Sequence, residues 1–248
     1  MSKLNTSLKK YPVYGHAIGI VMQEDCLIRF PGDVGNATTF DYPVRYKVVK
    51  GVDPKVLKNP VEAIKYVKFF VEAAQELEKE GVRAIVGGCG FQAIYQKEMV
   101  EALNIPVFTS SLIQVPMVHY SLKRGKKVGI ITANSQCLSE EYFRAVGWSS
   151  DSIPVRIEGM ENLEPRFSTI AGESEELIKK VRENTLVKLS IDFIQRNPDI
   201  GAIVLECTNL PPCSYAIQKA VHLPVFDIVT LINWVYYGVT CKKYMGYL

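Results

Sequence analysis

Two cysteines at equivalent places of an internal repeat are the residues of this sequence best suited to chemistry. The segment AIVGGC ends at Cys89, and AIVLEC ends at Cys207, 118 residues later, with four of the six residues identical. At the same offset, NIPVF at 104–108 matches HLPVF at 222–226 without a gap. A cysteine thiolate can act as a nucleophile or as a base. The repeat therefore predicts a site that contains a pair of thiols.

Both cysteines stand where an apolar strand is expected to end and a helix to begin. The positive end of a helix dipole at such a junction would lower the pKa of a thiol below its free value of about 8.5. We therefore expect reactive thiols at Cys89 and Cys207. The other four cysteines have no counterpart at the repeat offset, and we expect them to be packing residues: Cys26, Cys137, Cys213 and Cys241.

The elements that would position the cysteines alternate between strands and helices. Apolar runs predict strands at 18–21, 82–86, 106–108, 128–131 and 202–205. Periodicity of 3.6 residues and capping residues predict helices at 59–80, 91–103 and 175–196, with a further helix opened by Pro211. This alternation predicts an α/β fold of two similar lobes, each with a parallel sheet flanked by helices.

A crevice between the lobes is the expected place for the site. Ligands of open α/β sheets bind beyond the carboxyl ends of the strands, so pseudo-twofold symmetry would make Cys89 and Cys207 face each other. The loop at 31–36, which contains Asn36, could cover this crevice or form a plain turn. The segment 155–172 shows little periodicity, and we expect an irregular connection there.

Short polar side chains stand at the same edge of the expected sheets. Together with backbone amides they could hold a carboxylate, although the same residue types also cap helices. The candidate binding residues from this pattern are Thr132, Asn134, Thr208 and Asn209. Glu206 is left out of the predicted site, because strand alternation would turn its side chain away from Cys207.

Composition and charge exclude several classes of partner. The 248 residues are 48% hydrophobic and 22% charged, which is typical of a folded globular protein. A net charge of +3 without long charged runs predicts neither a nucleic-acid nor a membrane partner. The sequence shows no signal peptide and no apolar segment of about 18 residues, so we expect a cytoplasmic protein with reduced cysteines.

Motifs for cofactors and metals are incomplete. The segment GCGFQA at 88–93 fits the Gly-x-Gly-x-x-Ala dinucleotide fingerprint, but Thr109 stands near the position where that fingerprint needs an acidic residue. The second copy of the repeat also lacks the glycines. The three histidines are scattered, and the cysteines do not follow zinc-binding spacing. We therefore expect neither a cofactor nor a metal.

These features together resemble the aspartate/glutamate racemase superfamily, which also includes hydantoin racemases, maleate isomerases and arylmalonate decarboxylases. The resemblance spans nearly the whole chain and is carried by ECTNLP at 206–211, GCG at 88–90 and VGIIT at 128–132. It implies a cofactor-independent amino-acid racemase or epimerase. In such an enzyme, Cys89 and Cys207 would remove and return a proton at a carbon next to a carboxylate, from opposite faces.

The resemblance also implies a substrate, a set of contacts and a domain arrangement. A small carboxylate or amino-acid-like substrate would lie near Gln23, Asn36, Gly90 and Phe91, besides the polar residues named above. Residues 1–115 with 227–248 would form the N-terminal lobe, and residues 116–226 the C-terminal lobe. A homodimer or higher homo-oligomer is also expected.

Three other functions stay open from the sequence. A maleate-isomerase-like enzyme would use one cysteine as a nucleophile toward a double bond. A hydantoin racemase would keep the two-thiol chemistry on a cyclic substrate, and the Gly90-Phe91 pair after the first cysteine is closer to that group. A two-lobed binding protein would close on a small molecule without chemistry.

Overall fold

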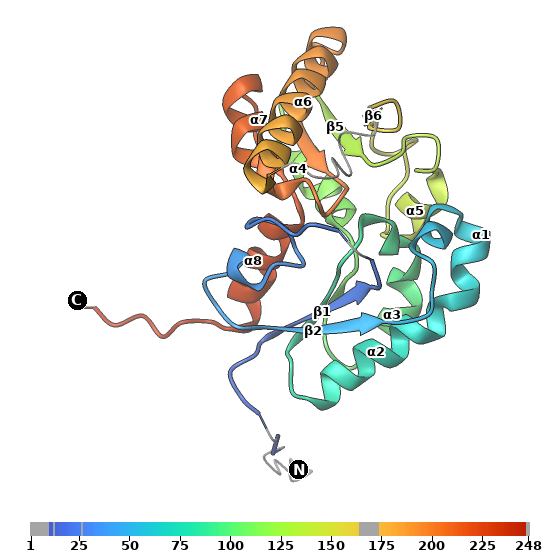
Figure 1. Ribbon diagram of the computed structural model, residues 1–248, viewed down its shortest axis with the longest axis vertical. Coiled ribbons are helices and arrows are strands. Elements are labelled where there is room, and N and C mark those ends of the chain that lie inside the picture. Colours follow the sequence, from blue (N-terminus) through green and yellow to red (C-terminus); the bar gives the residue numbers. More distant parts are fainter. Residues whose placement is uncertain (1–9, 12, 26, 164–173, 247–248) are drawn as a thin grey trace.

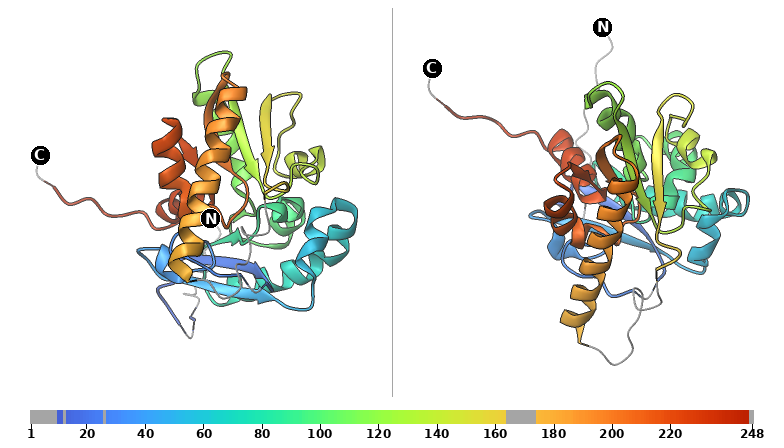
Figure 2. Two further views of the ribbon diagram at one scale, coloured as in Figure 1. Left: turned by 45° about the horizontal axis from the view of Figure 1, so that its top comes forward. Right: turned by 90° about the horizontal axis from the view of Figure 1, so that it is seen from above.

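The chain folds into two four-stranded parallel sheets. Helices flank the sheets, as Figures 1 and 2 show. The structure is a computed structural model that describes residues 10, 11, 13–25, 27–163 and 174–246. Cys26 and the end of the segment 155–172 lie outside the described residues. The predicted α/β class with two similar sheets is confirmed.

The two sheets have the same strand order. The first sheet has the order β2-β1-β3-β4, with β1 at Ile18–Gln23, β2 at Val44–Val49, β3 at Ala84–Gly87 and β4 at Val107–Phe108. The second has the order β6-β5-β7-β8, with β5 at Lys127–Thr132, β6 at Val155–Gly159, β7 at Ile200–Leu205 and β8 at Val225–Phe226.

The strand registers reproduce the repeat seen in the sequence. Ile85 pairs with Val107 in the first sheet, and Ile203 pairs with Val225 in the second, so the 118-residue offset is kept across both pairings. All of these pairings are parallel, which directs the carboxyl ends of the strands of each sheet to one edge.

Short and long helices connect the strands. The α-helices are α1 at Pro60–Ala63, α2 at Val67–Lys79, α3 at Gln96–Ala102, α4 at Val115–Ser121, α5 at Glu140–Ala145, α6 at Glu175–Arg196, α7 at Ser214–Val221 and α8 at Ile228–Val239. The 3₁₀ helices are η1 at Ala37–Thr39, η2 at Pro54–Lys58, η3 at Ile64–Tyr66, η4 at Gly90–Tyr95, η5 at Ser111–Gln114 and η7 at Pro211–Cys213.

Helices cover both faces of each sheet, which explains the nearly continuous apolar runs of the central strands. In the first sheet, Ile20 packs with Ile232 of α8 in one cluster, while its neighbour Val21 packs in another cluster with Phe70 of α2. The C-terminal helix α8 therefore lies against the first sheet, as Figure 1 shows. The division of the chain into lobes at 115 and 226 stays a prediction.

Three expectations about the elements need correction. The helix expected at 59–80 is interrupted by the 3₁₀ turn η3, and the helix expected at 91–103 begins with the 3₁₀ helix η4. The segment 155–172 is not irregular from its start, because β6 pairs with β5 there. Strand β2 is not among the strands expected from the apolar runs. Strands β2 and β6 each lie at the edge of a sheet and are mostly half-buried, so they lack the apolar run that marks the central strands.

Among the described residues, no helix is long and apolar enough to cross a membrane.

Candidate active site

Cys89 and Cys207 line one cavity of about 270 Å³ between the two sheets. Each cysteine lies in the turn that follows the third strand of its sheet in chain order, β3 or β7, and in each turn the residue before the cysteine donates a backbone hydrogen bond to the adjacent strand. The amide of Gly88 donates to the carbonyl oxygen of Val21 at 2.9 Å, and the amide of Glu206 donates to that of Ile131 at 2.8 Å. The two turns are therefore equivalent in hydrogen bonding as well as in sequence.

The cavity walls come from both halves of the chain. The first half contributes Gln23, Asp25, Leu27, Pro54, Lys55, Lys58, Gly88, Cys89, Gly90 and Phe91. The second half contributes Ala133, Glu206, Cys207, Thr208 and Asn209. A small organic molecule is the size of ligand that fits such a volume.

Buried hydrogen bonds hold the two cysteine turns against each other. The Thr208 hydroxyl donates to the carbonyl oxygen of Gly88 at 2.8 Å, and the Ser111 hydroxyl donates to that of Leu205, also at 2.8 Å. These contacts cross between the two halves of the chain. They restrain the position of one thiol relative to the other.

Backbone amides favour the thiolate of each cysteine, whereas burial opposes it. The amide of Phe91 hydrogen-bonds the Cys89 thiol, and the amide of Asn209 hydrogen-bonds that of Cys207. Burial and the nearby carboxyl of Glu206 nevertheless raise the pKa of Cys207 to about 12, and they raise the pKa of Cys89 as well. This direction is opposite to the expectation from helix dipoles, because loss of hydration outweighs the amide contribution.

Glu206 lines the cavity together with both cysteines, contrary to the expectation that strand alternation turns it away from Cys207. Its side chain is fully buried, and Oε2 accepts a 2.8 Å hydrogen bond from the Thr132 hydroxyl. Burial raises the pKa of this carboxyl to about 7. Strand alternation does not apply to Glu206, because β7 ends at Leu205 and the chain turns there. The signal in the sequence was an acidic residue at the end of an apolar run, directly before the cysteine.

A charged loop of the first half closes one side of the cavity. Arg29 is ion-paired with Asp25 and, at 3.0 Å, with Asp33, and its Nη1 donates to Oδ1 of Asn209 at 2.7 Å. Gly32 of the same loop has φ +101°, and a Cβ there would lie 2.9 Å from the Cα of Pro212. The segment 31–36 thus packs on the cysteine turn of the second half. Sequence reasoning missed Arg29 and both aspartates.

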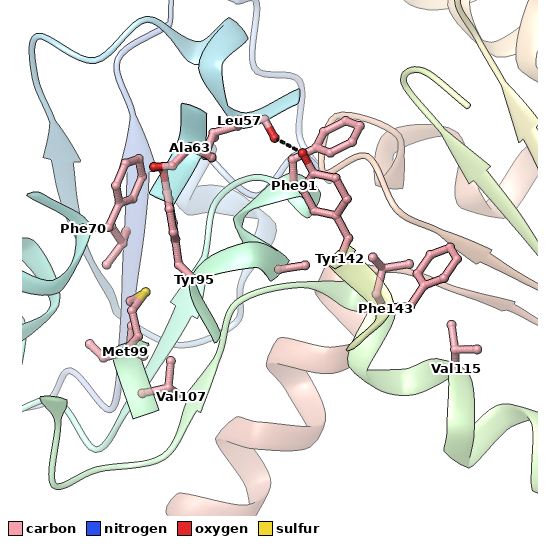
Figure 3. Packing of buried hydrophobic residues seen from close by; sticks show 14 of the residues in the cluster. Leu57, Ala63, Phe70, Phe91, Tyr95, Met99, Val107, Val115, Tyr142 and Phe143 are labelled. Carbon is pink, nitrogen blue, oxygen red and sulfur yellow. Dashed lines mark hydrogen bonds between the residues drawn. The ribbon is translucent and has the colours of Figure 1, made fainter. Parts of the chain in front are cut away.

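Phe91 is positioned by packing between the two halves, as Figure 3 shows. Its ring lies edge-on to Tyr142 of α5, with centroids 5.2 Å apart. The hydroxyl of Tyr142 donates a 2.6 Å hydrogen bond to the carbonyl oxygen of Leu57. Leu57 precedes Lys58 in the 3₁₀ helix η2. One aromatic pair therefore connects the wall near Cys89 with η2, which contributes Lys55 and Lys58 to the cavity.

The structure brings seven of the ten predicted site residues to the cavity: Gln23, Cys89, Gly90, Phe91, Cys207, Thr208 and Asn209. Three do not line it. Asn36 caps η1 and donates to the carbonyl oxygen of Arg29. Asn134 accepts from the amides of Gln136 and Cys137. Thr132 is buried behind Glu206. The side chains of Asn36 and Asn134 thus accept hydrogen bonds from nearby backbone amides, as capping residues do, and they do not contact the cavity.

The remaining described cysteines differ in environment. Cys213 is buried in one core cluster, and Cys137 is partly buried and packs against another, as expected for packing residues. Cys241 is exposed, so the expectation of a packing role is wrong for it. No group of three or more histidine, cysteine, aspartate or glutamate side chains in the described part of the chain is placed to bind a metal ion.

Comparison with known proteins defines the class to which this fold and site belong. Residues 53–234 match the sequence model of the Asp/Glu/Hydantoin racemase family. The chain therefore belongs to this family, and the resemblance stated from the sequence is confirmed.

Solved structures show the same fold. Unliganded arylmalonate decarboxylase is similar with a TM-score of 0.58 and 16% identity, covering 92% of this chain and 94% of that one. Glutamate racemase from Thermus thermophilus in complex with β-chloro-D-alanine gives a TM-score of 0.56 and 18% identity, covering 94% and 85%.

Two proteins named as lyases have a higher sequence identity to the chain than these solved structures. A dimethylsulfoniopropionate lyase of Durusdinium sp. clade D is 32% identical over 225 residues, which are 89% of this chain and 74% of the relative. Dimethylsulfoniopropionate lyase 3 of Emiliania huxleyi is 32% identical over 209 residues, which are 82% of this chain but only 54% of the relative.

Proposed function

We propose that the chain is a cofactor-independent enzyme in which Cys89 and Cys207 transfer a proton at the carbon next to the carboxylate of a small substrate. The observation that carries this proposal is the placement of both thiols, from equivalent turns, in the wall of one cavity. Two groups of similar chemistry on either side of one carbon are what proton removal and return require. Membership of a family of racemases supports the same reading.

The surroundings of the thiols suit this chemistry. A thiolate that forms in a cavity with little water is a stronger base than a thiolate in solution, because its charge is poorly hydrated. The amides of Phe91 and Asn209 would stabilise such a thiolate at either cysteine. Lys55 and Lys58 at the cavity wall would attract a substrate carboxylate.

Racemisation or epimerisation is the reaction that the pair of thiols favours. One thiolate removes the α-proton, the C–H electron pair is delocalised into the carboxylate, and the second thiol supplies a proton from the other face. The configuration at the carbon is thereby inverted. The substrate needs no leaving group.

Elimination is a second candidate, favoured by the 32% identity to proteins named dimethylsulfoniopropionate lyase. Dimethylsulfoniopropionate carries a carboxylate on the α-carbon and a sulfonium group on the β-carbon. Removal of the α-proton would form a carbon–carbon double bond as the carbon–sulfur bond breaks with its electron pair on sulfur. The products would be dimethyl sulfide and acrylate, and only one base would be needed.

Proton NMR in D2O separates these reactions. The purified protein is incubated with dimethylsulfoniopropionate and, separately, with single enantiomers of aspartate, glutamate, other amino acids and hydantoins. Loss of an α-proton signal without a new product indicates proton exchange and racemisation, whereas acrylate and dimethyl sulfide indicate elimination. A covalent adduct on one cysteine with maleate, found by mass spectrometry, would instead support the isomerase alternative.

The cysteine variants test the proposed roles. Cys89→Ala and Cys207→Ala are each expected to lower turnover at least about 100-fold, the usual contribution of a general acid or base. Cys241→Ala removes an exposed thiol and should keep full activity. Full activity in both cavity variants would contradict the proposal. If elimination is lost in one of the two cavity variants and kept in the other, the cysteine whose replacement abolishes it is the single base.

A further inference from the structure

Glu206 is a buried carboxylic acid in the wall of the same cavity as the two thiols, and the proton-transfer scheme has not used it. It precedes Cys207 in the same turn, and its side chain lies against the turn that carries Cys89. A Cβ at Gly90 would lie 2.1 Å from Oε1 of Glu206. The absence of a side chain at position 90 is therefore what makes room for this carboxyl group beside the first cysteine.

The two oxygens of this carboxyl have different surroundings. Oε2 accepts from Thr132, and the backbone amide of Ala133 also hydrogen-bonds the carboxyl. Oε1 is buried and has no hydrogen-bond partner among the described residues. An unpartnered oxygen in a fully buried acid is costly unless it exchanges a proton or binds a ligand. It is the oxygen that faces the first cysteine turn.

Several titratable groups among the described residues interact electrostatically with Glu206. They are the thiols of Cys89 and Cys207, the ammonium of Lys58 in η2 and the phenol of Tyr142 in α5. Each thiol is less acidic because of the Glu206 charge. Charge on the carboxylate therefore opposes charge on either thiol, and the titrations of the three groups are coupled.

We propose that Glu206 is a third acid/base group of the site, which takes up the proton of a cysteine thiol when that cysteine becomes a thiolate and returns it at the end of the reaction. This role rests on the proposed proton-transfer function. It predicts that the carboxylate and the thiols share a single negative charge.

The proton balance closes over one turnover. The S–H bond of Cys89 breaks, its electron pair stays on sulfur, and the proton binds Oε1 of Glu206. The thiolate then removes the substrate α-proton and is a thiol again. Cys207 gives its proton to the carbanion and becomes a thiolate, and Glu206 returns its proton to Cys207. The enzyme regains its starting form, so the second turnover needs no exchange between two enzyme forms.

The first test needs no substrate. The rate of alkylation by neutral iodoacetamide is measured for Cys89 and Cys207 between about pH 5.5 and 9.5, with peptide mass spectrometry to separate the sites. In the wild type, we expect the rates to rise up to about pH 7 and then level off, because ionised Glu206 suppresses the thiolate. In Glu206→Gln, the rates should continue to rise and be about tenfold higher than in the wild type at about pH 8.

Two controls accompany this measurement. The exposed thiol of Cys241 should react equally in both proteins, which controls for the reagent, and the buried thiol of Cys213 should stay unreactive in both, which shows that the variant has not opened. Glu76→Gln makes the same change on the surface of α2 and should leave every profile unchanged. If Glu206→Gln fails to fold, the wild-type profile still decides: rates that rise through pH 7 without levelling at both cavity cysteines would overturn the proposal.

The second test uses turnover of whichever substrate is found. Although its thiols are more reactive, Glu206→Gln should lower kcat by about 10- to 100-fold with little change in KM, and Glu206→Asp should recover part of it. Wild-type kcat in Glu206→Gln would overturn the proposal. If the wild type acts on no substrate tested, the proposed function fails, while the alkylation profiles still report whether Glu206 and the thiols share a proton.

Discussion

The hydroxyl of Thr208 donates a 2.8 Å hydrogen bond to the carbonyl oxygen of Gly88, and this bond joins the two turns that carry the cysteines. Thr208 is almost completely buried, so water cannot replace the bond easily. The relative position of the two thiols therefore depends on a contact between residues that are far apart in the chain.

Replacement of Thr208 by valine should separate this positional role from general stability. The variant keeps the side-chain shape and loses the hydroxyl, so we expect a loss of about 1 to 2 kcal/mol in the free energy of unfolding. Activity should fall about tenfold or more, because catalysis depends on the spacing of the reacting groups. Urea denaturation and turnover give the two values. Thr240→Val removes a hydroxyl-to-carbonyl bond at the end of α8 and should not affect turnover.

Replacement of Gly90 by alanine should disturb the cavity. Its Cβ would lie 2.1 Å from the Glu206 carboxyl, a separation that forces movement of one of the two turns. We expect a cost of about 1 to 3 kcal/mol and a strong loss of activity. Gly238→Ala in α8 is the matched control, since nothing lies within 4 Å of its Cβ, and it should be neutral or slightly stabilising. Equal effects of the two variants on turnover would contradict this prediction.

Arg29 should be required for stability in a pH-dependent way. Its loss leaves the carboxylates of Asp25 and Asp33 without their cation, and for pairs this buried we expect a cost of about 2 to 4 kcal/mol at pH 8. Burial raises the pKa of Asp33, and Arg29 opposes the rise. In Arg29→Ala we expect the pKa of Asp33 to be higher still. The contribution of Asp33 to the free energy of unfolding is then most favourable at low pH, and it is lost as the pH rises through the folded-state pKa.

Urea denaturation of Arg29→Ala at about pH 5 and about pH 8 checks this dependence. The deficit relative to the wild type should be smaller at the lower pH. Arg45→Ala removes a more exposed pair with Glu80, and its cost should stay below about 1 kcal/mol at both values. A deficit of Arg29→Ala that grows on acidification would show that the sign of this argument is wrong.

Glu206 should make the wild type less stable at high pH. Its pKa is raised from 4.5 to about 7 by burial, so the folded protein holds a proton that the unfolded chain has lost. The associated stability is fully present below about pH 4.5 and is lost as the pH rises to about 7. Relative to Glu206→Gln, the wild type should therefore lose on the order of 3 kcal/mol across this window. Parallel pH dependences of unfolding in the two proteins would contradict the prediction.

Much of this fold follows from local patterns in the sequence. Helix α6 was predicted with the same bounds, 175–196, because its length and capping signals are contained within the segment. The central strands were predicted because burial on both faces makes them continuous apolar runs. The cysteine pair was found because a duplicated chain repeats its residues at a constant offset, and both copies fold into the same strand order.

By itself, the sequence thus determined the α/β class, the repeat and the two cysteines at matching strand ends. Only the tertiary structure decided that Glu206, and not Thr132 or Asn134, joins them at the cavity, and that Arg29 fastens the first loop to Asn209. The acidity and the contacts of such groups depend on burial between two sheets, with partners up to 180 residues away in the chain. No local pattern encodes an environment that forms only when the two halves meet.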